Sequence, residues 1–332
     1  MQSRTLGSKG PNVSALGLGC MGMSDFYGPA DRKESIATFH AALDAGITLL
    51  DTGDYYGMGH NELLIREGLT GRKREQALIS VKFGALRDPK GQWIGIDTRP
   101  IAVKNFLAYT LKRLGTDYID IYRPGRVDPA VPIEDTVGAI AELIDAGYVR
   151  YVGLSEAGAE TIRRAHALCP VADLQIEYSL MSRGIEKSIL PVCNELGVGI
   201  TAYGVLSRGL LSGHWSAERA TGGADFRKFM PRFSAANVQH NLNMVEALRA
   251  IAERKNATVA QLAIAWVLSR GEQIVPLIGA RRREQLSESI SALDIELAPD
   301  ELAELEQAVR SVDVQGGRYA PAQLQHLDSE RG

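Results

Sequence analysis

Three residues able to carry out acid–base chemistry stand at or near the ends of two neighbouring apolar runs. The carboxylic acid Asp51 follows the run 47–50, the amine Lys82 ends the run 79–82, and the phenol Tyr56 lies shortly after Asp51. An ammonium beside a phenol favours the phenolate, so we expect Lys82 to lower the pKa of Tyr56 and make it a proton donor at neutral pH. The alternative is a buried Asp51–Lys82 ion pair with a tyrosine that only packs against it.

These residues can meet if the two runs are neighbouring parallel strands, and the rest of the chain supports such a sheet. Short β-rich runs alternate with longer amphipathic stretches from about residue 47 to residue 290, and no linker rich in Pro or Ser divides them. Most of the runs are almost continuously apolar, as parallel strands covered on both faces are. The predicted strands are 16–20, 48–51, 77–82, 118–122, 151–154, 174–176, 199–203 and 274–277.

The stretches between these strands carry helix start and stop signals. Pro100 suits a first helical turn, an apolar stripe follows through residues 103–114, and Gly115 ends the pattern. Pro132 and Gly147 bracket the next predicted helix in the same way.

Eight strand–helix repeats with short connections predict an α/β fold, a (β/α)8 TIM barrel forming a single domain over residues 1–332, because a closed parallel sheet exposes no strand edge. An open doubly wound sheet is the alternative. Residues 3–18 predict an N-terminal β-hairpin. Since barrel enzymes keep their chemistry at the C-terminal face of the strands, long loops are expected there. Residues 206–237 predict a cofactor or substrate loop, and residues 312–332 a C-terminal loop or tail.

Charge and composition exclude several kinds of partner. The 332 residues include 37 Lys+Arg and 40 Asp+Glu, a net charge of -3, which leaves no basic field for nucleic acid or an anionic membrane. No apolar run approaches the roughly 18 residues of a membrane span, and residues 1–8 have no signal-peptide core, so we expect a cytoplasmic protein.

Three cysteines and six histidines form no metal-ligand motif, so no metal is expected. Nothing in the sequence supports a homo-oligomer.

A glycine motif near the N-terminus has two readings. Gly17, Gly19 and Gly22 spell G-x-G-x-x-G, but the residues after Gly22 read as a loop, whereas a Rossmann fingerprint requires a helix there. We therefore interpret the motif as a strand end at which a ligand approaches the backbone closely.

Several short segments occur in a fixed order between about residue 4 and residue 293. They are Leu50-Asp51-Thr52, Tyr56-Gly57, Asn61-Glu62, Lys82, 117–122, 150–155, Gln175, Tyr178-Ser179 and 202–209. In this order they resemble the aldo-keto reductase family. The resemblance implies an oxidoreductase that binds an extended nicotinamide dinucleotide without a Rossmann domain and reduces a small-molecule substrate, an aldehyde or ketone, to the alcohol by hydride transfer. It further implies that Tyr56 is the general acid, that Lys82 tunes it and that Asp51 anchors the lysine.

One catalytic position departs from the family pattern. The family motif Tyr-x-x-His-Arg-x-Asp reads here as residues 122–128 with Gly125 in place of the histidine, which would orient the carbonyl by a hydrogen bond. In one interpretation Gly125 leaves room for a bulky ketone or a water, while Arg123 or Arg126 supplies positive potential. The alternative is an NADPH-binding sensor or regulatory module with vestigial reductase activity.

The resemblance also implies a set of cofactor contacts. Ser155 and Gln175 match the positions that hold the nicotinamide carboxamide, and Tyr203 matches the aromatic residue that stacks on the ring, while position 156 is Glu where Asn is usual. Residues 279–288 match the segment that receives the adenosine phosphate, where guanidinium groups favour NADPH over NADH. The complete predicted set is Gly22, Met23, Asp51, Ser155, Gln175, Tyr203, Gly204, Leu206, Arg208, Gly209, Gly279, Arg281, Gln285 and Glu288.

Overall fold

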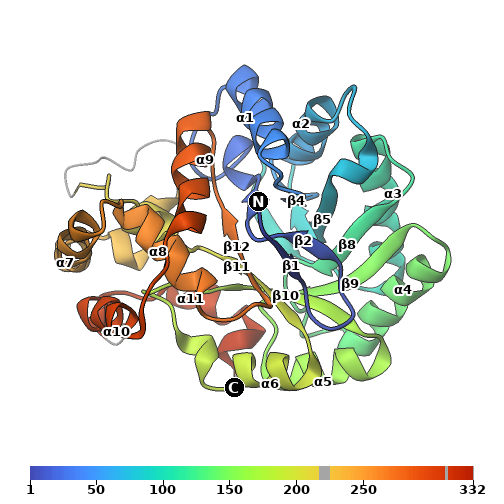
Figure 1. Cartoon of the computed structure of the whole chain (residues 1–332). Coiled ribbons are helices and arrows are strands. Elements are labelled where there is room, and N and C mark those ends of the chain that lie inside the picture. Colours follow the sequence, from blue (N-terminus) through green and yellow to red (C-terminus); the bar gives the residue numbers. More distant parts are fainter. Residues whose placement is uncertain (217–224, 311–312, 332) are drawn as a thin grey trace.

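Eight parallel strands close into a barrel at the centre of the molecule (Figure 1). The computed structural model describes residues 1–216, 225–310 and 313–331. Around the barrel the strands follow the order β10-β11-β12-β3-β4-β5-β8-β9. Their bounds are β3 (Gly17–Gly19), β4 (Leu49–Gly53), β5 (Leu78–Phe83), β8 (Ile119–Pro124), β9 (Val149–Ser155), β10 (Val171–Glu177), β11 (Gly199–Tyr203) and β12 (Ile274–Ile278). Each predicted strand contains or overlaps one of them, so the prediction of a (β/α)8 barrel is confirmed.

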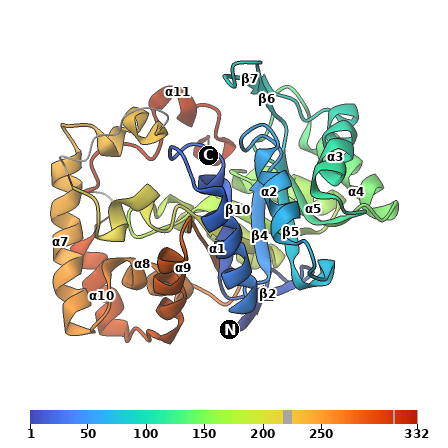
Figure 2. The ribbon, with the colours of Figure 1, turned by 90° about the horizontal axis from the view of Figure 1, so that it is seen from above.

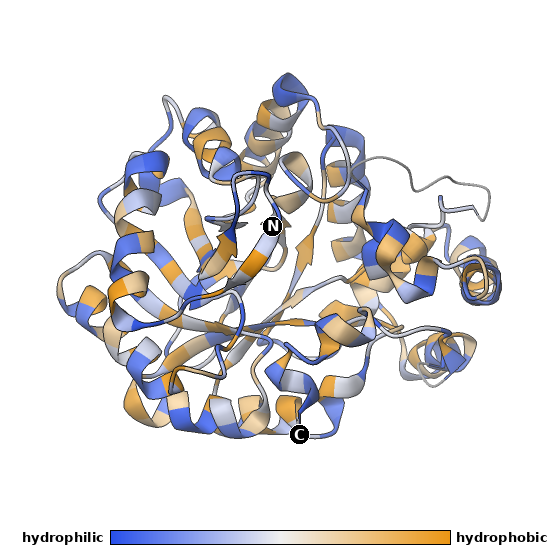
Figure 3. Cartoon of the chain, turned by 180° about the vertical axis from the view of Figure 1, so that it is seen from behind, coloured by the Kyte–Doolittle hydropathy of each residue, from blue (hydrophilic) through white to orange (hydrophobic). Residues whose placement is uncertain are grey.

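Helices surround the barrel, as Figures 1 and 3 show. Hydrophobic residues gather on the strands and on the helix faces turned toward them, and charged residues lie mainly on the outer faces (Figure 3). The helices are α1 (Arg32–Asp44), α2 (His60–Gly68), α3 (Pro100–Leu114), α4 (Ile133–Asp145), α5 (Ala159–Leu168), α6 (Ile189–Leu196), α7 (Val238–Arg254), α8 (Val259–Leu268), α9 (Arg283–Ile290), α10 (Pro299–Ala308) and α11 (Pro321–Leu324). None of the helices in the described ranges combines the length and apolar character needed to cross a bilayer.

The start and stop signals of α3 work as the sequence predicts. Pro100 is the first helical residue, and Gly115 adopts the left-handed conformation, with φ of 67°, that ends the helix. Val103, Leu107 and Leu114 are buried along the predicted stripe. Burying such a side chain contributes roughly 1.5–3 kcal/mol relative to leaving it exposed, so the stripe fixes which face of α3 meets the barrel.

The predicted N-terminal hairpin is present and covers the amino-terminal end of the barrel. Strands β1 (Ser3–Thr5) and β2 (Asn12–Ser14) pair antiparallel. Leu6 and Val13 pack against barrel residues that include Leu49 and Ile121. Figure 2 shows the N-terminus at one end of the barrel, opposite α11.

The opposite end carries a second hairpin that the sequence did not predict. Strands β6 (Ala85–Arg87) and β7 (Trp93–Ile96) pair antiparallel beyond the end of β5. Figure 2 shows this hairpin and α11 on the same end of the molecule. Both strands are short, and β7 contains Gly95 at φ of 154°. They therefore lack the long alternating pattern by which strands are recognised.

The glycine motif does not begin an α-helix. It leads into a single 3-10 turn, η1 (Met21–Met23), and α1 begins only at Arg32. Met23 was expected in a loop and instead ends this turn. The interpretation against a Rossmann fingerprint is confirmed, because that fingerprint needs a helix N-terminus directly after the glycines.

Candidate active site

Asp51 and Lys82 form a buried ion pair at the carboxyl ends of two neighbouring strands. Strands β4 and β5 pair in a register that places Gly53 opposite Lys82, and Lys82 Nζ lies 2.5 Å from Asp51 Oδ2. The other oxygen, Oδ1, accepts hydrogen bonds from Ser80 Oγ at 3.1 Å and from Gln175 Nε2 at 2.7 Å. Three side-chain donors therefore hold this carboxylate, and the carboxylate in turn holds the lysine in place.

Tyr56 lies beside this pair, but its pKa moves in the opposite direction from the prediction. Lys82 Nζ is 5.0 Å from the centroid of the Tyr56 ring, which is buried at 6% exposure. Burial raises the pKa of Tyr56 well above 10, Tyr55 and Asp51 raise it further, and Arg126 opposes them. Burial also lowers the pKa of Lys82, against the attraction of Asp51. The prediction of a lowered tyrosine pKa is wrong, because a phenolate loses more from desolvation than the nearby cations return.

The space beside Gly125 is filled, which corrects the interpretation that it leaves room for a bulky ketone or a water. A Cβ built on Gly125 would lie 2.9 Å from the hydroxyl oxygen of Tyr55, 3.2 Å from its Cε1 and 3.3 Å from the carbonyl oxygen of Phe83. The Gly125 amide donates to that same carbonyl at 2.7 Å, which fixes the backbone there. Tyr55 was not among the site residues predicted from the sequence, although its place directly before Tyr56 was a signal that could have identified it.

The two arginines flanking Gly125 have different surroundings. Arg123 is fully buried inside the barrel, where its Nη1 lies 3.0 Å from Asp173 Oδ2 and its Nη2 donates to Ser80 Oγ at 2.6 Å. Its charge is paired with the Asp173 carboxylate inside the barrel. The expectation that Arg123 supplies positive potential to a substrate is therefore wrong. Arg126 is half-buried, and its positive charge acts on both Tyr55 and Tyr56.

The predicted nicotinamide contacts come from neighbouring strands at the same end of the barrel. Gln175 of β10 lies in register with Ser155 of β9, and Tyr203 of β11 lies in register with Glu177 of β10. The Tyr203 hydroxyl donates to Glu156 Oε1 at 2.7 Å. Glu156 has φ of 53°, a left-handed conformation that Asn adopts more readily than Glu, so the usual Asn at this position has a backbone reason.

The C-terminal segment is anchored over these residues through Glu156. Arg318 Nη2 and Nη1 donate to Glu156 at 2.5 and 3.0 Å, and Ser329 Oγ donates to it at 2.6 Å. The Tyr319 hydroxyl lies 3.0 Å from that of Tyr203. Burial disfavours the Glu156 carboxylate, but Arg318 and the other donors prevail and lower its pKa to about 2. Of the predicted tail 312–332, residues 312 and 332 lie outside the described residues.

The predicted loop 206–237 begins with a tight turn at the end of β11. The 3-10 segment η4 (Ser207–Ser212) contains Arg208 at φ of 56° and Gly209 at φ of 105°. Arg208 donates to Glu177 Oε2 at 3.0 Å, and its guanidinium lies 4.5 Å from the centroid of the Tyr319 ring. Leu206 and Gly204 precede this turn. Residues 217–224 of the predicted loop lie outside the described residues.

The predicted adenosine-phosphate segment meets the glycine motif at the N-terminus of α9. A Cβ on Gly22 would lie 3.4 Å from Arg281 Cδ, and the Arg281 amide donates to Gln285 Oε1 at 3.0 Å. Gly279 has open space, with no atom within 4 Å of a built Cβ. Arg283 is paired with Glu34 of α1 at 3.0 Å, whereas Arg282 is exposed. The Glu288 carbonyl accepts a hydrogen bond from Gln261 Nε2 at 3.3 Å.

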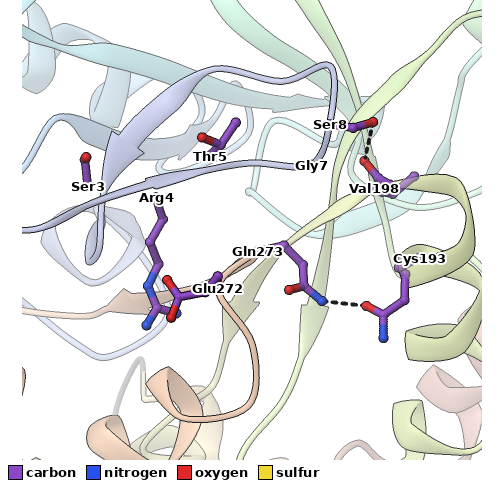
Figure 4. Close-up of a pocket in the computed structure, with 11 residues that line it drawn as sticks. Ser3, Arg4, Thr5, Gly7, Ser8, Cys193, Val198, Glu272 and Gln273 are labelled. Atoms are coloured by element: carbon purple, nitrogen blue, oxygen red, sulfur yellow. Dashed lines mark hydrogen bonds between the residues drawn. The ribbon is translucent and has the colours of Figure 1, made fainter.

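Two hollows lie away from the Asp51–Lys82 pair. One, of about 620 Å³, is at the amino-terminal end of the barrel and is lined by the N-terminal hairpin, Cys193, Glu272 and Gln273 (Figure 4). Arg4 there donates to the carbonyl oxygen of Ile274 at 2.6 Å, a contact that ties the hairpin to the barrel. A second hollow, of about 470 Å³, lies beside the β6–β7 hairpin and includes Leu86 and Asp135. In the described ranges no group of three or more His, Cys, Asp or Glu side chains could hold a metal ion.

Fold and site together define a TIM barrel whose carboxyl end carries an aspartate–lysine–tyrosine cluster. The Aldo/keto reductase family model matches residues 15–310. The curated protein "Probable aldo-keto reductase 1" from Glycine max is 42% identical over 324 residues, which cover 96% of this chain and 92% of that protein. This chain belongs to the aldo-keto reductase family, and it is an oxidoreductase.

Solved structures of the same family are similar over nearly their whole length. The glycerol dehydrogenase AKR11B4 from Gluconobacter oxydans has a TM-score of 0.84 at 27% identity, covering 96% of this chain and 98% of that one. The aldo-keto reductase AKR11C1 from Bacillus halodurans, in its holo form, has a TM-score of 0.77 at 27% identity, covering 94% and 97%. Nicotinamide cofactors and small carbonyl substrates are general to the family.

Proposed function

We propose that this protein is an NADPH-dependent reductase that converts an aldehyde or ketone to the alcohol, with Tyr56 as the general acid. The observation that carries the proposal is the cluster of Asp51, Lys82 and Tyr56 at the carboxyl end of the barrel. The lysine is 2.5 Å from the aspartate and 5.0 Å from the tyrosine ring centroid. Membership of the aldo-keto reductase family supports the same reaction class.

The residues expected to hold the cofactor fit an extended dinucleotide. Ser155 and Tyr203 end strands β9 and β11, and Gln175 lies near the end of β10 between them, which supports a nicotinamide site at this end of the barrel. Gly279 has open space around its Cα, which lets a ligand approach the backbone closely. When bound there, NADPH supplies the hydride. Arg281 and Arg282, at the start of α9, would grip its 2′-phosphate.

The chain's own residues then donate the proton and stabilise the charge that the donation leaves. Burial keeps the pKa of Tyr56 high, so its hydroxyl stays protonated at neutral pH and is ready to donate to the oxygen of a reduced carbonyl. The Lys82 ammonium stabilises the phenolate that this donation leaves behind. Asp51 keeps the ammonium in position, and Ser80 and Gln175 keep Asp51 in position. Lys82 and Asp51 thus stabilise the negative charge on Tyr56 as the proton leaves, and they do not ionise Tyr56 beforehand.

The test is consumption of NADPH, followed at the absorbance of its reduced ring, with a panel of aldehydes, ketones and quinones. We expect turnover by the wild type and a loss of at least about 100-fold in kcat for Tyr56→Phe, the scale of general acid catalysis. Tyr148→Phe, at an exposed tyrosine, is the matched control and is expected to match the wild type. Tight NADPH binding with no turnover on any carbonyl would favour the sensor or regulatory module instead.

A further inference from the structure

We propose that Tyr55 orients the substrate carbonyl, its hydroxyl donating the hydrogen bond that a side chain at position 125 would otherwise provide. This inference rests on the proposed reductase function and assigns a second phenol to the same site. Tyr56 would transfer its proton, and Tyr55 would keep its own while holding the carbonyl oxygen.

The Tyr55 hydroxyl stands where a side chain at position 125 would be. It lies 2.9 Å from the place where a Cβ on Gly125 would stand, inside the volume that any side chain there would occupy. The Tyr55 and Tyr56 rings lie edge to face, with centroids 5.0 Å apart and an interplanar angle of 81°. The phenols of two adjacent residues therefore lie side by side, and Gly125 is the residue that leaves room for the second one.

The Tyr55 hydroxyl also differs from other buried tyrosine hydroxyls in its hydrogen bonding within the described part of the chain. Buried tyrosines generally satisfy their hydroxyl, as Tyr122 does with the Val103 carbonyl at 3.0 Å and Tyr178 with Glu186 at 2.7 Å. Tyr55 is 8% exposed, and its hydroxyl makes no hydrogen bond to any of the residues that the structure describes. A donor held in this way is prepared for a partner from outside the chain.

The surroundings of Tyr55 hold its ring in place and keep its hydroxyl protonated. Trp93 of β7 packs edge to face on Tyr55 at 5.9 Å between centroids. Burial raises the pKa of Tyr55, and although Arg126 opposes this change, the hydroxyl remains a donor at neutral pH. A fixed donor aimed at the position where negative charge develops stabilises the transition state more than the ground state.

The experiment compares Tyr55→Phe, which removes only the hydroxyl, with Tyr56→Phe and with the exposed control Tyr148→Phe. For Tyr55→Phe we expect kcat/KM to fall about 100-fold, the scale of losing one oxyanion donor. The NADPH dissociation constant should change less than about twofold, since the hydroxyl faces the substrate. In the complex with NADP+, which cannot react, the dissociation constant of a ketone from the panel should rise by roughly fivefold, the scale of one hydrogen bond.

Two further variants separate a hydrogen bond from simple packing. Tyr55→His retains a donor and should recover about tenfold over Tyr55→Phe. Gly125→Ala places a methyl group within 2.9 Å of the hydroxyl oxygen, so it must displace Tyr55 and should cause a comparable loss. This variant leaves Tyr55 intact and tests the proposal even if Tyr55→Phe folds poorly. Added to Tyr55→Phe, Gly125→Ala should cause little further loss, because both changes remove the same interaction.

The outcomes distinguish this inference from the proposed function. If Tyr55→Phe stays within threefold of the wild type in kcat/KM and in ketone binding while Tyr56→Phe is inactive, the role of Tyr55 is refuted and the reductase stands. If the wild type consumes no NADPH with any carbonyl, the proposed function fails and this inference fails with it.

Discussion

Replacing Arg318 tests the contact that joins the C-terminal segment to the barrel. Arg318→Gln removes both guanidinium hydrogen bonds to Glu156, which is fully buried. Among the described residues, Tyr203 and Ser329 remain as its side-chain donors. Lowering the pKa of Glu156 from 4.5 to about 2 corresponds to about 3 kcal/mol in favour of the folded chain at neutral pH. Breaking a buried ion pair on one side costs roughly 3–5 kcal/mol, which agrees with that figure.

Hydrogen exchange measures this loss directly. The amide of Ser329 donates to the Glu156 carbonyl at 3.0 Å, so its protection reports whether the segment 313–331 is in place. At pH 7 we expect its protection factor to fall about 100-fold in Arg318→Gln, as about 3 kcal/mol implies. The exposed Arg331, which donates to the Gln325 carbonyl, provides the control, and Arg331→Gln should leave the protection nearly unchanged.

The pH dependence has a defined sign. Because the folded pKa of Glu156 is depressed, its stabilisation is complete above the unfolded value of about 4.5 and is lost as the pH falls toward about 2. The difference between wild type and Arg318→Gln should therefore shrink across that window. An equal difference at pH 7 and pH 3, or wild-type protection in the variant at pH 7, would refute the reasoning.

Three further predictions concern other sites. Both carboxylate oxygens of Asp54 are buried without a hydrogen-bond partner among the described residues, and burial, then Glu62, raises its pKa well above 3.8. Asp54→Asn should therefore stabilise the chain by roughly 1–3 kcal/mol in urea unfolding at pH 8. It should have little effect at pH 4, since the raised pKa removes stability only as the pH rises. A Cβ on Gly153 would lie 2.8 Å from Asp173 Oδ1, so Gly153→Ala should cost roughly 1–3 kcal/mol in the same assay, and wild-type stability would contradict this. If the exposed Arg282 grips the 2′-phosphate, Arg282→Ala should raise KM for NADPH about tenfold and leave KM for NADH unchanged, and equal changes for both would contradict that role.

The repeating pattern and the catalytic pair could be predicted from the sequence because they depend on local information. Apolar runs and glycine or proline punctuation act over a few residues, so β11 and α3 have the bounds that the sequence predicts. Once the strands are parallel, their carboxyl ends must meet, which brings Asp51 to Lys82 without knowledge of any other contact.

The surroundings of these residues depend on the closed barrel and could not be predicted from the sequence. Arg123 was expected to act on the substrate, whereas the closed barrel pairs it with Asp173 inside. The pKa of Tyr56 was expected to be lowered by Lys82, whereas packing buries the phenol and raises that pKa.

Sequence by itself determined the barrel, the family and the three residues that would carry the proton chemistry. Tertiary structure decided what stands next to them. Tyr55 fills the place beside Gly125, and Arg318 reaches Glu156 from far along the chain. Local backbone preferences cannot encode such contacts, because distant side chains are brought together, and removed from water, only by the packing of the whole barrel.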